Sequence, residues 1–181
     1  MLSDNSLFLA VDQWKALNYT ADKLEYKKIY KKGSQNSVSF KSSKIKLPKK
    51  NQIKNKIIYD ITTSIQMTNF VRALTGINHY SVDSCESHLY EEGDFFSPEW
   101  AKINFQASEY VFCLFLDGSY TGGDHVVNKP GGKENIYTPK SGEILIASCD
   151  CCHEVKPVIS GKRRLVLACI QPLIGIDPHV A

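Results

Sequence analysis

Short runs of apolar residues separated by turn residues fill the C-terminal half of the chain. The runs are rich in β-branched and aromatic side chains and lie at residues 88–90, 110–116, 125–128, 143–147, 154–158 and 164–170. Turn pairs such as Asp117–Gly118, Gly122–Gly123 and Ser141–Gly142 stand between them. Several short strands at this spacing are typical of a β-sandwich or barrel. We therefore predict a jelly-roll in this half of the chain.

The N-terminal part has a different pattern. Apolar residues from Leu7 to Leu17 are interrupted by polar ones and weakly predict a strand that leads into a short helix. The apolar positions from Ile57 to Leu74 are spaced as on a helix that packs through one face. Gly76 follows as a plausible C-terminal cap. The N-terminal helices are thus expected to support the barrel.

The size of the chain fits one domain. It has 181 residues, of which 43% are hydrophobic and 23% charged. We predict a mainly β fold with N-terminal helices: a supporting segment over residues 1–76, a core over 77–173 and a tail over 174–181. No apolar run approaches the roughly 20 residues of a membrane span, so no membrane partner is expected.

The state expected for the six cysteines depends on the cellular compartment of the protein. No basic region precedes an apolar stretch at the N-terminus, so a secretory signal is not expected. We therefore expect free thiols and an intracellular protein, cytoplasmic or nuclear. Cys149, Cys151, Cys152 and His153 also invite a zinc interpretation. Neighbouring residues of a strand point to opposite faces, which argues against a shared ion.

The net charge of +3 conceals an asymmetry. The segment Lys27–Lys56 holds eleven Lys and no Asp or Glu, which leaves 11 basic against 19 acidic residues elsewhere. A solvated loop or two short Lys-rich edge strands explain such a segment. The functional alternative is contact with an acidic partner or with nucleic-acid phosphates through Lys49, Lys50, Lys54 and Lys56. Without Arg, such contact is expected to be independent of base sequence.

Three segments carry candidate chemistry. The first, Tyr90 to Ala101, begins as Tyr-x-x-Gly-Asp-Phe-Phe-x-Pro. The second opens with a Gly-Gly-acidic turn that ends before His125. The third contains His153 in a His-Glu-Val-x-Pro-Val context, and Arg163 lies ten positions after that histidine.

In order and spacing these segments resemble the Fe(II)/2-oxoglutarate-dependent dioxygenases, in particular the prolyl 4-hydroxylase-like branch. The resemblance covers roughly residues 77–170, about half of the chain. It implies a double-stranded β-helix, with His153 as the distal iron ligand and Arg163 binding the distal carboxylate of 2-oxoglutarate. Tyr90 is a further candidate for the same cofactor site. A protein substrate or protein partner is the implied binding partner.

The chemistry of the family explains this pattern. Two His and one carboxylate hold Fe(II) on one face and leave three positions for 2-oxoglutarate and O₂. Arginine offers a planar, bidentate clamp for a carboxylate. The resemblance thus implies hydroxylation coupled to decarboxylation of 2-oxoglutarate.

The sequence departs from the family at the first two iron ligands. The expected His-x-Asp falls on Glu99 and Ala101. Glu99 offers a carboxylate in place of an imidazole, and Ala101 offers no ligand. Three interpretations follow: a binding scaffold without iron, a rewired site that joins Glu99 and His153 with His125 or His88, or an engineered inactivation of a working enzyme.

The function that we predict is therefore a dioxygenase-like protein of the prolyl-hydroxylase type with an incomplete iron triad. We expect a catalytically impaired protein, or pseudoenzyme, that acts by binding. The first alternative is an active 2-oxoglutarate-dependent hydroxylase with a rewired metal site. The second is a nucleic-acid-binding protein that uses the Lys-rich segment. The structural alternatives are that His153 is a packed histidine on a strand, His125 a core or surface histidine and Arg163 a solvated cation in a hairpin. Glu99 could likewise be a loop carboxylate.

Overall fold

The structure is a computed structural model that describes residues 9–31, 38–45, 56–97, 108–116, 118–129 and 131–173. It contains the helices α1 (Val11–Asp22), α2 (Lys56–Thr62) and α3 (Ile65–Thr75). Its strands are β1 (Lys27–Lys31), β2 (Val38–Lys44), β3 (Tyr80–Tyr90), β4 (Phe95–Phe96), β5 (Tyr110–Phe115), β6 (Tyr120–Gly122), β7 (His125–Asn128), β8 (Asn135–Tyr137), β9 (Ile144–Ser148), β10 (Cys152–Val155), β11 (Val158–Gly161) and β12 (Arg163–Pro172).

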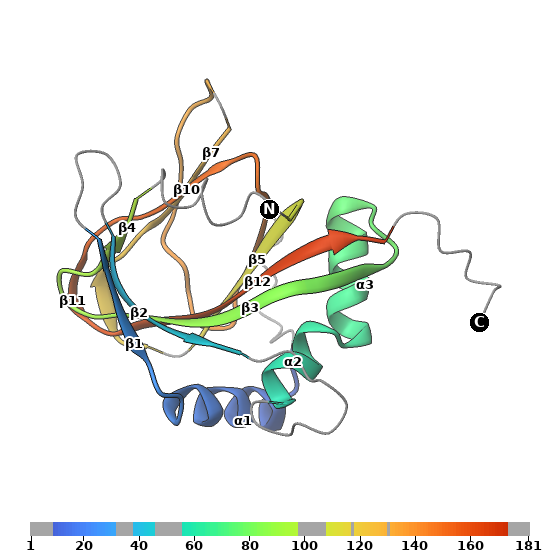
Figure 1. Cartoon of the computed structure of the whole chain (residues 1–181), viewed down its shortest axis with the longest axis horizontal. Coiled ribbons are helices and arrows are strands. Elements are labelled where there is room, and N and C mark those ends of the chain that lie inside the picture. Colours follow the sequence, from blue (N-terminus) through green and yellow to red (C-terminus); the bar gives the residue numbers. More distant parts are fainter. Residues whose placement is uncertain are drawn as a thin grey trace.

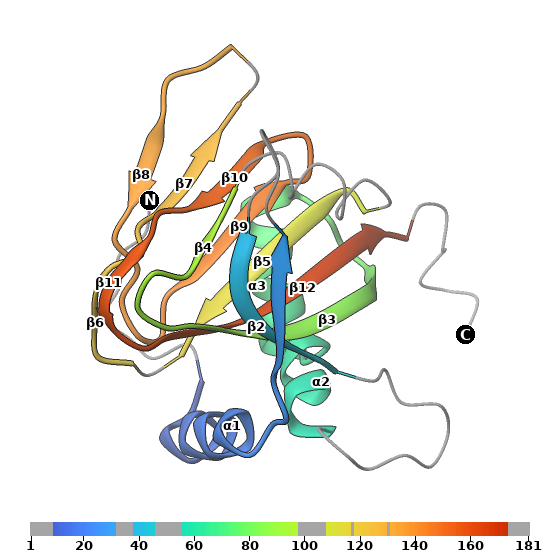
Figure 2. The ribbon, with the colours of Figure 1, turned by 60° about the vertical axis from the view of Figure 1, so that its left-hand side comes forward.

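The strands form one large curled sheet and one small sheet. The large sheet has the order β8-β7-β10-β4-β2-β3-β12-β5-β9, with β1 paired to β2, and β11 pairs with β6 in the small sheet. The sheet curls round on itself into an open barrel (Figures 1 and 2). This arrangement confirms the predicted mainly β fold and its double-stranded β-helix architecture.

Alternation along β12 divides the core into two layers. Val166, Ala168 and Ile170 belong to the outer cluster, whereas Leu165 and Cys169 belong to the barrel interior. Successive side chains of a strand point to opposite faces, so one strand serves both layers. No described helix is long and apolar enough to cross a membrane.

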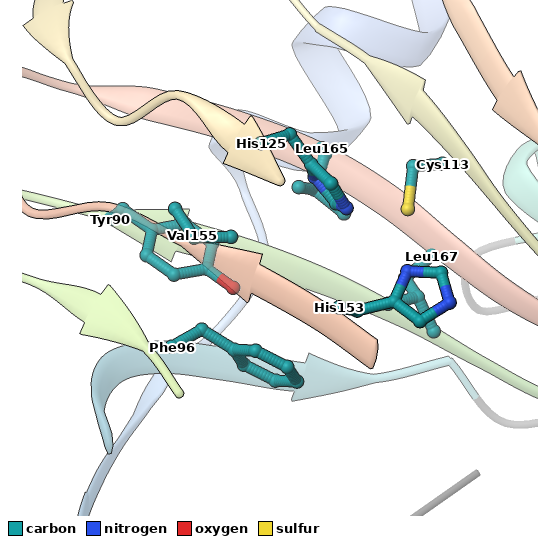
Figure 3. A pocket seen from close by; sticks show the side chains of 8 residues that line it. All are labelled: Tyr90, Phe96, Cys113, His125, His153, Val155, Leu165 and Leu167. Atoms are coloured by element: carbon teal, nitrogen blue, oxygen red, sulfur yellow. The ribbon is translucent and has the colours of Figure 1, made fainter. Parts of the chain in front are cut away.

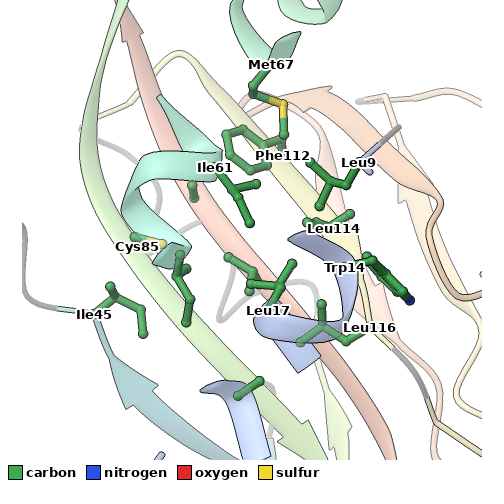
Figure 4. Packing of buried hydrophobic residues seen from close by; sticks show 14 of the residues in the cluster. Leu9, Trp14, Leu17, Ile45, Ile61, Met67, Cys85, Phe112, Leu114 and Leu116 are labelled. Carbon is green, nitrogen blue, oxygen red and sulfur yellow. The ribbon is translucent and has the colours of Figure 1, made fainter. Parts of the chain in front are cut away.

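The outer layer joins the three helices to the convex face of the sheet. Trp14 and Leu17 of α1 and Met67 of α3 pack over Phe112 and Leu114 of β5 (Figure 4). Each of these side chains is at most 8% exposed. The helices therefore support the sheet from outside and leave the barrel interior to other side chains.

The helix predicted from Ile57 to Leu74 is wrong in one respect, because two helices cover it. The Thr63 hydroxyl donates to the Tyr59 carbonyl at 2.9 Å, and the Ser64 hydroxyl accepts from the Met67 amide at 3.2 Å. Such local bonds compete with the helical ladder and favour helix ends. The side chain of Ser64 thereby caps α3 at its N-terminus.

The cap predicted at Gly76 is confirmed. This residue has φ 77°, and its amide donates to the Arg72 carbonyl at 2.9 Å. The strand predicted over residues 154–158 is instead divided between β10 and β11. Pro157 stands at the division, where it has no amide proton for a ladder hydrogen bond.

The Lys-rich segment contributes two strands rather than a bare loop. Strand β1 lies beside β2, but β2 sits between β4 and β3 within the large sheet. The expectation of an edge position therefore fails for β2, because its Phe40 is fully buried in the barrel interior. Residues 46–55, which include Lys49, Lys50 and Lys54, lie outside the described residues.

Several described lysines of this segment face acidic partners. Lys28 forms an ion pair with Asp94, and Lys41 forms one with Glu91 at 2.5 Å. Lys56 pairs with Asp60 at 2.6 Å, one turn along α2. The charge of the segment is thus partly balanced by the acidic remainder of the domain.

Candidate functional site

A small, partly open pocket lies in the barrel interior. Figure 3 shows the side chains that line it. They are Tyr90, Phe96, Cys113, His125, His153, Val155, Leu165 and Leu167. Both histidines point into a space whose other walls are largely apolar.

Pairing of β7 with β10 places the two histidines on one face. Val155 lies opposite His125, and Val127 lies opposite His153, so the imidazoles are diagonal neighbours. Their ring centroids are 6.0 Å apart, edge to face. They are 4% and 3% exposed. Both histidines singled out by sequence therefore face the barrel interior.

Arg163 begins β12 and is fully buried, with 0% exposure. Its Nη2 donates to Nδ1 of His125 at 3.2 Å. The guanidinium carbon lies 5.1 Å from the ring centroid of Tyr90 and 5.3 Å from that of Phe115, which is cation–π geometry. Its Nε and Nη1 make no hydrogen bond to any described residue.

The Gly-Gly turn makes room for this side chain. Gly123 has φ 66°, and a Cβ at this position would lie 3.1 Å from Cδ of Arg163. Glycine is therefore favoured here both by its backbone conformation and by the close approach. Beside the guanidinium, burial raises the pKa of Tyr120, and the charge of Arg163 and its polar contact with the Tyr120 hydroxyl oppose that rise.

The surroundings of Arg163 fit an anionic ligand. A buried charge without a partner of opposite sign costs several kcal/mol, and no acidic side chain is among the described partners of this guanidinium. Its two remaining donor nitrogens, Nε and Nη1, lie on different edges of the guanidinium, and each offers a hydrogen bond to an anion. A carboxylate beside the guanidinium would balance its charge and accept a hydrogen bond from it.

The contact with Arg163 fixes the proton on His125. A guanidinium cannot accept a hydrogen bond, so Nδ1 accepts and the neutral ring carries its proton on Nε2. Burial, with the nearby charge of Arg163 and of His153, holds the pKa of His125 well below its usual range. Nε2 is buried and has no described hydrogen-bond partner. It is a donor in this state, without a lone pair for a metal.

The hydrogen bond of His153 places its ring proton by a different contact from that of His125. Its Nε2 lies 3.3 Å from the Ser148 carbonyl, which can only accept, so this nitrogen carries the proton. Burial lowers the pKa of His153, and the hydrogen bond to Ser148 partly opposes that shift. Nδ1 is then the nitrogen with the lone pair.

The described residues do not fit an Fe(II) triad. No carboxylate is among the described lining residues, and the described part of the chain contains no group of three His, Cys, Asp or Glu able to hold a metal ion. Glu99 and Ala101 lie outside the described residues. Among the described residues, the pocket thus lacks the carboxylate of a 2-His-1-carboxylate centre.

His88, the other histidine considered for a rewired site, does not line this pocket. It binds Glu86 and Tyr90 on its own strand. Sequence reasoning missed this network as well as the contact between Arg163 and His125. The first has a signal in the sequence, since three polar residues alternate at positions 86, 88 and 90 of one strand.

All six cysteines are free, as expected. Burial raises the pKa of Cys113 and of Cys149 to about 12, which keeps both thiols protonated near neutral pH. In β10, His153 is buried while the adjacent Cys152 is half-buried, as alternation requires.

The lowered pKa values predict a loss of stability in mild acid. Below about pH 6.5 the unfolded chain protonates His125 and His153, whereas the folded chain resists, so stability falls with pH. We expect about 1 kcal/mol per imidazole between pH 7.5 and 5.5. Urea unfolding across this range measures the change in the free energy of unfolding. His153→Gln should remove the contribution of one imidazole to that change. An identical pH dependence in this variant would contradict the assignment.

Comparison with known proteins agrees with this architecture. No protein-family model matches the sequence, and no curated protein matches it. Many solved structures do match, and they share the fold of the 2OG-Fe(II) oxygenases and prolyl hydroxylases. The chain therefore has the double-stranded β-helix of that class, which confirms the fold implied by the resemblance.

Three solved structures illustrate the match. A 2OG-Fe(II) oxygenase family oxidoreductase from Burkholderia pseudomallei has a TM-score of 0.81 and 15% identity, over 93% of this chain and 83% of that one. A prolyl-4-hydroxylase from Pseudomonas putida has a TM-score of 0.63 and 16% identity, over 92% and 89%. A prolyl hydroxylase from Trichoplax adhaerens, in complex with a hypoxia inducible factor peptide, has a TM-score of 0.64 and 12% identity, over 91% and 81%.

Proposed function

We propose that this protein binds a small dicarboxylate of the 2-oxoglutarate type inside its barrel and acts through binding, without a complete iron site. The observation that carries the proposal is Arg163, a fully buried guanidinium whose Nε and Nη1 have no described hydrogen-bond partner. Such a group is costly unless a ligand of opposite charge completes it.

Different residues in and beside the pocket would hold different parts of this ligand. Arg163 donates to one carboxylate and balances its charge, and the proton on Nε2 of His125 offers a further hydrogen bond. Apolar walls from Phe96, Val155 and Leu167 limit the access of water to the site. Exclusion of water strengthens the attraction between the guanidinium and the anion.

The absence of iron chemistry is proposed from the donor set. Ala101 has no ligating atom at the position where the resemblance expects Asp. The alternative, an active hydroxylase with a rewired site of Glu99, His153 and His125, requires His125 to give up its hydrogen bond from Arg163. That bond opposes the rewired site and supports the binding function.

The partner that we propose is a protein or peptide at the open end of the barrel. The Trichoplax adhaerens neighbour is seen with a peptide, and fold alone does not fix such a function. The nucleic-acid alternative receives less support, because Lys28, Lys41 and Lys56 have acidic partners.

Thermal unfolding in the presence of a chelator tests the proposal. At 100 times its Kd, 2-oxoglutarate should stabilise the protein by about 2.7 kcal/mol, which corresponds to roughly 5–11 °C in Tm for a domain of this size. Sodium chloride at equal ionic strength is the control. No shift at any concentration of 2-oxoglutarate would contradict the proposed function.

A further inference from the structure

Strand β1 lies at an edge of the large sheet. Its residues pair with β2 in antiparallel register, from Lys27 opposite Ser42 to Lys31 opposite Val38. The other side of β2 is taken by β3 and β4, and no described strand lies on the far side of β1. Figure 2 shows β1, in dark blue, at the front of the sheet beside β2. The outer N–H and C=O groups of such a strand can pair with another extended chain.

The side chains of β1 divide between two faces. Ile29 is opposite Phe40 and packs against the buried cluster of the barrel interior. Lys27 and Lys31 share that face, because residues two apart on a strand point the same way, and both are exposed. Tyr30 lies on the other face and is 65% exposed. An added strand would therefore meet an apolar side chain between two lysines on one face and an exposed ring on the other.

The charge of this edge is positive. Strand β1 carries three lysines and β2 carries two, and neither strand has an acidic residue. Two of these lysines, Lys28 and Lys41, have acidic partners in the domain. Lys27 and Lys31 form no ion pair with any described residue. These two charges therefore remain for a partner from outside the domain.

The same lysines disfavour pairing of β1 with a second copy of itself. Antiparallel pairing of two β1 strands centred on Ile29 would place Lys27 opposite Lys31 at both ends. Like charges directly opposite one another destabilise a sheet, and lysine at an edge strand is a common protection against self-association. A strand of opposite charge meets no such repulsion, so the edge selects against its own sequence and in favour of an acidic one.

We propose that β1 is a docking edge for an acidic extended segment of a partner protein, which adds to the sheet as a strand antiparallel to β1. The segment would place Asp or Glu opposite Lys27 and Lys31 and a β-branched apolar residue opposite Ile29. Cross-strand pairs of these kinds are favourable. The inference rests on the proposed function only in taking a protein as the partner, and it adds the edge that this partner uses and the chemistry of its segment.

Fluorescence anisotropy of a labelled peptide tests the docking edge. The acidic peptide is Glu-Thr-Val-Thr-Glu flanked by glycines, which has the pattern that β1 requires. It should bind wild type, and the lysine peptide, with Lys in place of both Glu, should bind about tenfold or more weakly. Because the ion pairs are exposed, salt screens them, so the affinity for the acidic peptide should fall from about 50 to about 500 mM NaCl.

An exchange of charges assigns the contact to particular lysines. The double variant Lys27→Glu, Lys31→Glu should bind the acidic peptide about tenfold or more weakly and should bind the lysine peptide instead. The matched control is Lys15→Glu, Lys133→Glu, which changes the net charge equally at exposed positions on α1 and before β8. Its affinity for the acidic peptide should stay within about twofold of wild type, because distant exposed charges are screened.

Methylation of peptide amides separates strand addition from charge contact alone, and it uses the wild-type protein. Alternate N–H groups of a strand point to the same side. Methyl groups on one alternate set of amides therefore block pairing with β1, whereas those on the other set point away from it. One methylated acidic peptide should bind about tenfold or more weakly than the other. Equal affinities of the two would overturn the proposal.

The remaining outcomes separate the docking edge from the proposed ligand binding. 2-Oxoglutarate should still raise the Tm of Lys27→Glu, Lys31→Glu, because neither lysine lines the pocket. If wild type responds to 2-oxoglutarate but does not bind the acidic peptide, the docking edge is overturned and the ligand binding stands. If it responds to neither, both are overturned. Single-stranded DNA that binds more tightly than the acidic peptide, with the same loss in the charge-reversed variant, would overturn the strand partner and assign these lysines to phosphates.

Discussion

Replacing Arg163 with Met is expected to abolish 2-oxoglutarate binding and to stabilise the protein without ligand. Truncating one partner of a buried charge pair costs about 2–5 kcal/mol, which weakens binding on the order of 30- to several thousand-fold. In the free protein, Met removes a buried charge that lacks an acidic partner and still packs against Tyr90 and Phe115. That exchange is expected to add about 1–4 kcal/mol to the free energy of unfolding.

Arg164 provides the matched control for this prediction. It follows Arg163 on β12 but pairs with Asp22, whose side chain is 58% exposed. Arg164→Met should leave 2-oxoglutarate binding unchanged. Titration calorimetry and urea unfolding of both variants give the two readouts. Wild-type affinity in Arg163→Met would contradict the binding role, and a less stable free protein would point to a structural role instead.

Phe112→Ala is expected to be the most destabilising single change to the outer layer. Phe112 is fully buried where the helices meet the sheet, and loss of such a ring costs about 3–5 kcal/mol. The Tm should therefore fall by roughly 6–20 °C. Because Phe112 faces away from the pocket, the Kd for 2-oxoglutarate should stay within about twofold of wild type at temperatures where the variant is folded.

Cys113→Ala is the natural comparison, since this neighbour on β5 lines the pocket. It removes one sulfur and should lower the Tm much less than Phe112→Ala. Thermal unfolding with and without 2-oxoglutarate measures both quantities. A large loss of affinity in Phe112→Ala would show that the two layers of the core are not independent.

Much of the fold follows from local patterns in the sequence. The strands from 110 to 116 and from 164 to 170 were predictable because both of their faces are buried, so their apolar runs are nearly continuous. Strand β3 was predicted only at its last three residues. Its earlier part carries Ser81, Asp83, Ser84 and Glu86. These polar residues interrupt the apolar pattern, so runs of apolar residues do not predict this part of the strand.

The site was predictable only in part. His153 and Arg163 stand in motifs with fixed spacing, and the structure places both beside one pocket. The contact between Arg163 and His125 joins residues 38 positions apart, and it depends on long-range strand placement that no local pattern encodes. The roles expected for Glu99, Lys49, Lys50 and Lys54 remain predictions, because these residues lie outside the described part of the chain.

The central claim is that the barrel binds a dicarboxylate without holding iron. Anaerobic titration of metal-stripped protein with Fe(II) and 2-oxoglutarate, followed in the visible region, tests it most directly. The double variant Glu99→His, Ala101→Asp restores the expected motif and serves as the positive control for the charge-transfer band of a chelated complex. We predict binding of 2-oxoglutarate to wild type with no such band. A band in wild type that disappears in His153→Ala would contradict the account and assign an iron site to this barrel.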